Sequence, residues 1–108
     1  MDLSVVIPTL NAAATLPATL DALGGAPREV IVSDGGSNDA TAERAAERGC
    51  RVVVAPRGRG SQIAAGVAAS SAPWLLLLHA DTRLGTGWAE MVASHMASDP
   101  GRAGYFRL

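Results

Sequence analysis

The sequence predicts an α/β fold in which helices flank a mostly parallel sheet. Short apolar segments, mostly β-branched, alternate along the chain with Ala-rich segments of helical length. The 108 residues allow one hydrophobic core, and 48% of them are hydrophobic. Because only one Tyr and one Phe are present, Val, Ile, Leu and Ala must form that core, which favours helices packed closely on a sheet.

Strands and helices are expected in strict alternation. The strands are predicted over 3–7, 29–33, 51–54 and 74–78, and the helices over about 12–23, 39–48, 60–71 and 85–98. Continuous apolar runs of this length are typical of parallel strands buried on both faces. In the first helix Leu16, Leu20 and Leu23 share one face. The segment 103–108 has the pattern of a further strand, so we expect residues 1–108 to be one domain, the N-terminal part of a longer one.

Charge and cysteine content exclude several classes of protein. Nine basic and ten acidic residues leave a net charge of −1, so no nucleic-acid partner is expected. The single Cys50 cannot form an internal disulfide, which fits a reducing cytoplasm. No signal-peptide pattern is present, and the apolar run 74–78 is far shorter than the ~20 residues of a membrane helix. We therefore expect a cytoplasmic protein, with peripheral attachment to a membrane left open.

Polar residues or glycines follow every predicted strand. These segments are Pro8-Thr9-Leu10-Asn11, Asp34 to Asp39, Pro56 to Gly60 and His79 to Thr82. In open parallel sheets, ligands bind beyond the carboxyl ends of the strands. One such loop would mean little, but four loops at the same edge predict a binding site.

The loops after the first two strands offer hydrogen-bonding groups. The Asp34 carboxylate could accept from a nucleobase imide or a ribose hydroxyl, or it could cap its own loop as an Asx-turn; ligand binding is preferred. Asn11 fits a ligand contact and a helix N-cap equally well. Asp39 is expected to cap the second helix.

The loops after the last two strands carry charge. His79 and Asp81 lie two residues apart after four leucines, so both could point toward one ion. A carboxylate suits Mg²⁺ or Mn²⁺, and imidazole is acceptable to Mn²⁺; the alternatives are a helix cap for Asp81 and a backbone partner for His79. Arg57 and Arg59, at the start of the third helix, suit a phosphate or a base edge, or form an exposed turn.

Taken together, these motifs resemble the family 2 glycosyltransferases of GT-A fold. The opening Ser4 to Asn11, the segment Val30 to Asp39, and Arg57 to Gly60 followed by Gln62 and Ala65-Gly66 are each similar to a family segment. His79-Ala80-Asp81 stands where the family carries its Asp-x-Asp motif, a pattern similar to one bacterial subgroup. The resemblance covers essentially the whole chain, in order.

The resemblance implies a Rossmann-like sugar transferase domain that binds a nucleotide-sugar donor, expected to be a UDP-sugar. It implies that Pro8 and Thr9 line the base pocket through backbone contacts, and that Asp34 binds the base with help from Arg59 or Arg57. It also implies that Asp81 coordinates Mn²⁺ or Mg²⁺ at the diphosphate, while His79 replaces the first Asp. The acceptor, whether sugar, lipid or small molecule, and the catalytic base belong to parts of the family pattern that this chain lacks.

Other nucleotide-binding classes fit less well. A nucleotidyltransferase would carry a Gly-rich, Lys-containing loop after the first strand, where this chain has Asn11 followed by three alanines. The G-x-G of a dinucleotide-binding enzyme occurs only after the third strand, and no Gly-Lys-Ser/Thr is present. The remaining alternative is a truncated, non-catalytic module that binds a nucleotide or a partner. Its incomplete sheet would expose an apolar edge and favour self-association.

Overall fold

The computed structural model describes residues 1–98, 101 and 104. The elements in chain order are β1 (Leu3–Thr9), α1 (Leu16–Leu23), β2 (Glu29–Asp34), α2 (Thr41–Glu47), β3 (Arg51–Val54), α3 (Arg59–Ala69), β4 (Trp74–Leu77) and α4 (Trp88–Ser98). Strands and helices alternate as the sequence predicts. The further strand expected over 103–108 lies outside the described residues.

The strands form one sheet in the order β3-β2-β1-β4, and every neighbouring pair is parallel. This confirms the predicted α/β fold. At the carboxyl edge of the sheet, Thr9 of β1 lies beside Asp34 of β2, and Asp34 lies beside Val54 of β3. The register therefore brings the ends of these three strands together.

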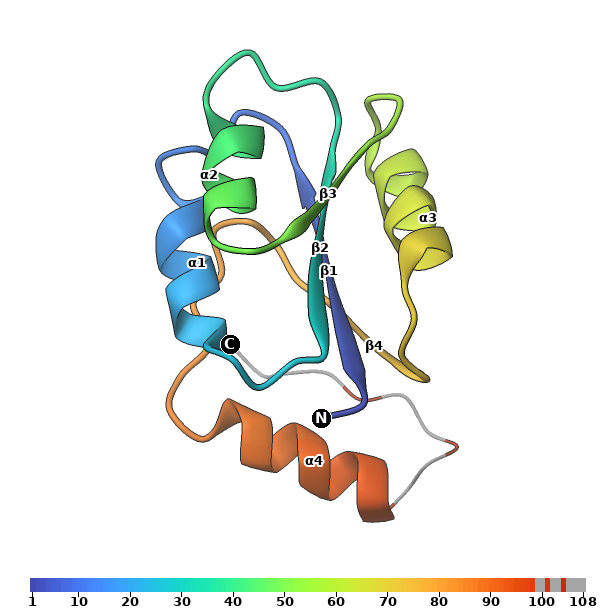
Figure 1. Cartoon of the computed structure of the whole chain (residues 1–108). Coiled ribbons are helices and arrows are strands. Elements are labelled where there is room, and N and C mark those ends of the chain that lie inside the picture. The colour runs from blue at the N-terminus through green and yellow to red at the C-terminus, as the bar shows by residue number, and fades with distance from the viewer. Residues whose placement is uncertain (99–100, 102–103, 105–108) are drawn as a thin grey trace.

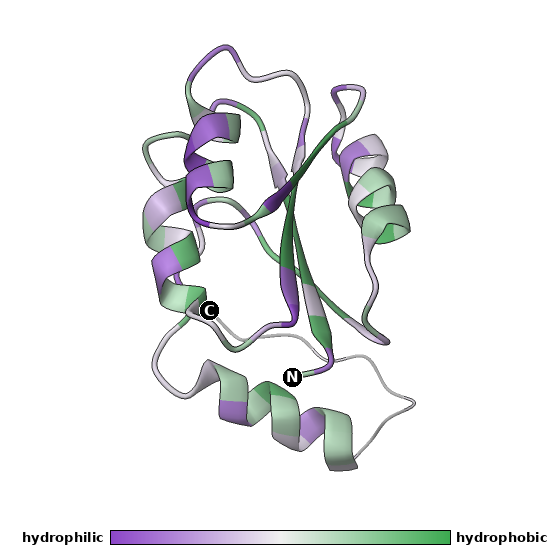
Figure 2. Ribbon diagram, in the orientation of Figure 1, coloured by the Kyte–Doolittle hydropathy of each residue, from purple (hydrophilic) through white to green (hydrophobic). Residues whose placement is uncertain are grey.

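Helices cover both faces of the sheet. Figure 1 shows α1 and α2 on one face, α3 on the other, and α4 below the end where β1 begins. Hydrophilic residues gather in α2 and in the loop before it, whereas the strands are largely hydrophobic (Figure 2). Within the described residues, no helix has both the length and the apolar character that a membrane crossing requires.

The larger part of the core lies on the face that α1 covers. The three leucines of the predicted apolar stripe are buried there with alternate residues of the strands, and the cluster includes Leu3, Val5, Ile7, Leu16, Leu20, Leu23 and Val32. Gly24 ends α1 with a positive φ of 64°, as expected of a C-cap glycine.

Gly66 allows α3 to lie close on the opposite face. A Cβ atom at this position would lie 2.4 Å from Cγ1 of Val6 in the central strand, a distance that no real side chain tolerates. A residue without a side chain at position 66 is therefore required by contact with β1.

The prediction that all strands are buried on both faces is wrong for β3 and β4. Both lie at the edges of the sheet that the described residues form, and α3 packs mainly against β1, β2 and β3. Leu75 and Leu77 of β4 are consequently 41% and 51% exposed. Val67 of α3 is also partly exposed.

The first helix begins at Leu16 rather than near residue 12. Asn11 has a positive φ of 52°, outside the helical region, and Thr15 occupies the N-cap position. The N-cap interpretation of Asn11 is therefore wrong. The backbone N–H group of Ala12 donates to the hydroxyl of Thr41, the first residue of α2, and that of Ala13 donates to Asp39 in the loop before α2.

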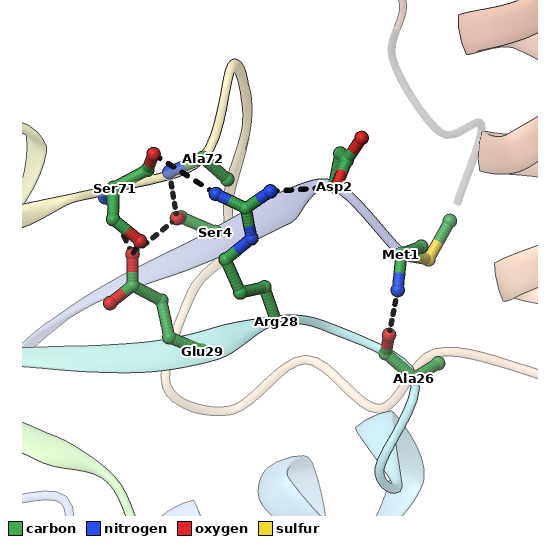
Figure 3. A network of polar contacts seen from close by, with 8 residues as sticks. All are labelled: Met1, Asp2, Ser4, Ala26, Arg28, Glu29, Ser71 and Ala72. Atoms are coloured by element: carbon green, nitrogen blue, oxygen red, sulfur yellow. Dashed lines mark hydrogen bonds and ion pairs between the residues drawn. The ribbon is translucent and has the colours of Figure 1, made fainter.

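A polar network fixes the opposite, amino-terminal edge of the sheet (Figure 3). Oε2 of Glu29 accepts hydrogen bonds from the Ser4 hydroxyl at 2.6 Å and from the backbone N–H and hydroxyl of Ser71 at 2.6 and 2.8 Å. These bonds lower the pKa of Glu29, with Ser4 contributing most. The network joins the α3–β4 connection to β1 and β2 at the edge away from the predicted site.

Candidate donor-binding site

The candidate site is built at the carboxyl edge, from the ends of all four strands. Thr9 and Asp34 are the last residues of β1 and β2, and they are register partners. Pro8 lies within β1 beside Ser33 and is half-buried. The sequence predicts that the strands end at residues 7 and 33, so that Pro8, Thr9 and Asp34 follow them; in the structure these residues belong to the strand ends themselves.

The Asp34 carboxylate is almost fully enclosed, with 4% of the residue exposed. Its Oδ1 accepts from the hydroxyls of Thr9 and Ser37, at 2.8 and 2.6 Å. Its Oδ2 accepts from the backbone N–H groups of Gly36 and Ser37, at 3.1 and 2.8 Å. Since a carboxylate has about four acceptor positions, protein donors occupy all of them.

This geometry corresponds to the loop-capping alternative for Asp34. Burial alone raises the pKa of the Asp34 carboxyl, but the hydrogen bonds from Ser37, Thr9 and Gly36 outweigh burial and leave the pKa below its ordinary value. The group is therefore held as an anion inside the loop. Contact of this carboxylate with a nucleobase stays a prediction, and it would require Asp34 to exchange one of its present partners.

The loops after β1 and β2 are joined to each other. The Ser37 hydroxyl, which donates to Asp34, accepts a 2.8 Å bond from the backbone N–H of Asn11. In return, the side-chain oxygen of Asn11 accepts from the backbone N–H of Asn38 at 2.8 Å. Asn11 therefore holds the two loops together, and its side-chain oxygen faces the second loop.

A second set of bonds continues this connection. Ala40 occupies the N-cap position of α2 without a side-chain cap bond, and Asp39 lies one residue before it rather than at the predicted cap. Asp39 accepts from the backbone N–H of Thr41 at 3.0 Å and also from the Thr41 hydroxyl. Its other oxygen accepts from the backbone N–H of Ala13 at 3.2 Å. The Thr41 oxygen accepts from the backbone N–H of Ala12 at 2.9 Å. The hydroxyls of Ser37 and Thr41 were not predicted as site residues, because a hydroxyl in a turn gives no distinctive sequence signal.

The buried side chain of Gln62 connects the third loop to the first two strands. Its Nε2 donates to the carbonyl oxygens of Thr9 at 2.8 Å and Ser33 at 3.1 Å, and its Oε1 accepts from the backbone N–H of Gly58 at 3.1 Å. No individual role for Gln62 was predicted from the sequence. Its spacing of four residues from Gly66 was the available signal, because that spacing places both residues on the helix face toward the sheet.

Arg59 and His79 meet across the end of the sheet, at the start of α3 and just after β4. Nη2 of Arg59 lies 2.5 Å from Nδ1 and 2.7 Å from Nε2 of His79. Arg57 is exposed, and its side chain makes no hydrogen bond or ion pair within the described part of the chain.

Asp81 faces an open depression that is lined by His79, Asp81, Thr82 and Arg83. The residue is exposed, and among the described residues its carboxylate has no hydrogen-bond or ion-pair partner. The backbone before it is fixed by the Thr19 hydroxyl of α1, which donates a 2.7 Å bond to the carbonyl of Ala80. A carboxylate without a partner is therefore held at the end of β4.

Comparison with known proteins identifies the family. The family model described as glycosyl transferase family 2 matches residues 4–104. The chain belongs to this family. The family 2 domain is 42% identical, over 85 residues, to an uncharacterized glycosyltransferase of Mycobacterium tuberculosis, a match that covers 78% of this chain and 38% of that protein. It is 36% identical over 91 residues to the PGL/p-HBAD biosynthesis glycosyltransferase of the same species, covering 75% of this chain and 36% of that one.

Solved structures share the fold of this family 2 domain. Glucosyl-3-phosphoglycerate synthase from Mycobacterium tuberculosis in complex with phosphoglyceric acid superposes with a TM-score of 0.80 at 26% identity, covering 92% of this chain and 40% of that one. The same enzyme in complex with Mn²⁺, UDP and glucosyl-3-phosphoglycerate gives a TM-score of 0.76 at 27% identity, covering 89% and 39%. This chain therefore spans about two fifths of the length of the proteins it matches.

The family implies a divalent metal. The side chains present fit a metal site in which the protein supplies few of the ligands. Within the described residues, no three His, Cys, Asp or Glu side chains come together. His79 is engaged by Arg59, which leaves the Asp81 carboxylate as the available oxygen ligand. Mg²⁺ is commonly held by one or two carboxylates with substrate phosphates and water, so a single free carboxylate in an open depression is compatible with that arrangement.

Proposed function

We propose that this family 2 domain binds the nucleotide-sugar donor of a transferase that moves the sugar of a UDP-sugar to an acceptor. The observation that carries the proposal is the unpartnered Asp81 carboxylate beside the Arg59–His79 pair, at the carboxyl edge of a parallel sheet. This is the edge where ligands of such sheets bind. The family match and the UDP and Mn²⁺ in the related synthase structures support the proposal.

Asp81 would hold the divalent metal, Mn²⁺ or Mg²⁺, together with the diphosphate of the donor. Bound there, the metal would supply positive charge that neutralises the diphosphate and stabilises it as a leaving group. Arg59, held against His79, places a further positive charge at the same edge. Arg57, which is exposed, is available to the diphosphate or to the base.

The nucleoside is assigned to the edge formed by Pro8, Thr9 and Asp34. Because the Asp34 carboxylate is saturated by protein donors, we propose that its main role is to shape the loop over which the base lies. Asn11 serves the same edge by holding the first two loops together. The acceptor site and the catalytic base are assigned to parts of the protein beyond this domain. Neither the family match nor the related structures favour a nucleotidyltransferase.

Calorimetric titration of UDP into the chain, with and without Mn²⁺, tests the donor site. We expect saturable binding with Mn²⁺ that excess chelator abolishes. Asp81→Asn should lose the Mn²⁺-dependent part of the affinity, because the amide removes the anionic ligand. Glu47→Gln, which removes an exposed carboxylate at the end of α2, is the matched control and should bind as the unmodified chain does. Binding that is unaffected by both chelator and Asp81→Asn would contradict the proposed metal site.

A further inference from the structure

The side chain of Gln62 makes hydrogen bonds to three backbone groups, each in a different segment of the chain. Both Thr9 and Ser33 lie at the ends of central strands, and their carbonyl oxygens accept from its amide nitrogen. Gly58, just before α3, donates to its amide oxygen, and the backbone N–H of Gln62 in turn donates to the Gly58 carbonyl at 2.9 Å. With 5% of the residue exposed, water has little access to replace these bonds.

A primary amide is the side chain that this position requires. It carries two N–H donors and one carbonyl acceptor, which match two carbonyls and one N–H. An apolar residue of the same length would remove all three bonds, leaving the Gly58 N–H without its partner and the Thr9 carbonyl with the Gly35 N–H alone. An ionised Glu would place negative oxygen against two carbonyl oxygens. The pairing is therefore specific to the amide.

Gly35 provides the space that Gln62 occupies. A Cβ atom at position 35 would lie 2.7 Å from Oε1 and 2.8 Å from Cδ of Gln62. Because Gly35 directly follows Asp34, the absence of a side chain there lets the amide reach the strand ends beside the Asp34 loop. The two residues are therefore sterically matched across the sheet edge.

Gln62 controls the place of the third loop through Gly58. Gly58 lies between Arg57 and Arg59 and has a φ of 144°, a conformation that L side chains rarely adopt. Its amide is anchored to Gln62, so the directions in which both arginines leave the backbone are set relative to Thr9 and Ser33. Arg59 then reaches His79 at the depression that contains Asp81.

We propose that Gln62 is a positioning residue of the donor site, which fixes the two arginines against the strand ends that receive the nucleotide. The identity of the bound ligand rests on the proposed function. The positioning of the two arginines rests on the contacts of Gln62 alone. The buried amide of Gln62 thereby aligns the loop that carries Arg57 and Arg59 with the loop that follows Asp34.

Titration of UDP with Mn²⁺ into Gln62→Met tests the effect on binding. Loss of supporting contacts behind a ligand site costs about 10- to 100-fold in affinity or activity, and we expect a loss in this range. Ser61→Ala changes the exposed neighbour on α3 and should bind normally. Ile31→Val, a buried change in β2, controls for lost stability. If Ile31→Val weakens binding as much as Gln62→Met does, Gln62 is merely structural and the proposal is wrong.

Gln62→Glu adds a readout that a structural role would not produce. When protonated, the carboxyl can donate to one strand carbonyl and still accept from Gly58, so it partly replaces the amide. The affinity of Gln62→Glu for UDP and Mn²⁺, relative to the unmodified chain at the same pH, should therefore recover as the pH is lowered. A ratio that is independent of pH would contradict the proposed pairing.

Amide hydrogen exchange separates this inference from the proposed function, since it needs no ligand. In the unmodified chain the Gly58 N–H should be protected by Gln62, and Gln62→Met should increase its exchange rate more than Ile31→Val does. Absence of UDP binding by the unmodified chain would refute the proposed function, while the Gly58 exchange rate would still decide whether Gln62 holds the loop. An unchanged Gly58 rate in Gln62→Met would overturn the positioning role.

Discussion

The Thr9 hydroxyl donates a 2.8 Å hydrogen bond to Oδ1 of Asp34, and the two residues are register partners at the ends of β1 and β2. This bond joins neighbouring parallel strands through side chains at the point where their backbones separate into loops. Ser37 and Gly36 occupy the remaining acceptor positions of the carboxylate. Asp34 is therefore the centre of the loop structure at this edge, and its substitution gives a first prediction.

Asp34→Ala should destabilise the fold more than Asp34→Asn. Alanine leaves buried donors unpaired, at a cost of about 1–3 kcal/mol for an unsatisfied group. Asparagine keeps one oxygen for the backbone N–H groups of Gly36 and Ser37, and its NH₂ group can donate to the Thr9 and Ser37 hydroxyls once these rotate to accept. Urea denaturation of both variants measures the difference in unfolding free energy. Equal losses would show that the hydrogen bonds contribute little.

Stability should fall in acid because of Asp34 and Glu29. Both carboxyl groups have a folded-state pKa below the ordinary value, so the folded protein binds fewer protons than the unfolded chain. Their contribution is fully present above the unfolded pKa values, which are about 4. It is lost as the pH falls through the lower folded-state values. Unfolding midpoints measured from pH 7 to pH 2 should follow this course.

Glu29→Gln isolates one part of this pH dependence. The amide cannot titrate, so the variant should be less stable than the unmodified chain at neutral pH and should lose less stability in acid. Glu47→Gln, an exposed change with no hydrogen bond to lose, should follow the unmodified curve. A parallel curve for Glu29→Gln would show that the network in Figure 3 does not contribute to acid unfolding.

Gly66→Ala should destabilise the domain, whereas Gly60→Ala in the same helix should not. At position 66 the new methyl group would lie 2.4 Å from Cγ1 of Val6, and overpacking of this kind costs about 1–3 kcal/mol. At position 60 a Cβ has nothing within 4 Å, so the variant should be neutral or slightly more stable. Thermal unfolding of both variants tests the contrast. In the double variant with Val6→Ala, part of the loss should be recovered.

His79→Asp should strengthen Mn²⁺-dependent binding of UDP. The variant places a second carboxylate two residues before Asp81 and within reach of Arg59, which can pair with it as it does with the imidazole. More anionic oxygen at the depression favours a hard divalent cation. Titration of UDP at several Mn²⁺ concentrations should show saturation at less metal than in the unmodified chain. A requirement for more metal would indicate that the Arg59–His79 contact is itself needed for the donor.

The fold was predictable because the pattern that specifies it is local. Each strand is a short apolar run, and the leucine spacing of α1 fixes its buried face. The edge positions of β3 and β4 were not predictable in this way. Leu75 and Leu77 have the composition of a buried strand, and only the strand order shows that β4 lies at an edge of the described sheet, where α3 packs mainly against the other strands.

The position of the candidate site was also predictable, but its internal contacts were not. Polar residues after parallel strands must meet at one edge, so the grouping of Thr9, Asp34, His79 and Asp81 follows from the topology. Asn11 was consistent with a helix cap from its residue type alone. Its actual role depends on hydrogen bonds with the backbone N–H of Asn38 and the hydroxyl of Ser37. Both residues are more than 25 positions away in the sequence and meet Asn11 across the loops.

The sequence specified the α/β architecture, the family and the edge of the sheet where the candidate site is predicted, because apolar periodicity and motif order are properties of the chain. Tertiary structure alone decided that Asp34 is saturated, that Asp81 is not, and that Gln62 joins three segments. The physical reason is that a hydrogen-bonding group takes its role from the partners brought within about 3 Å of it, and only the packing of α3 and the loops on the sheet supplies those partners.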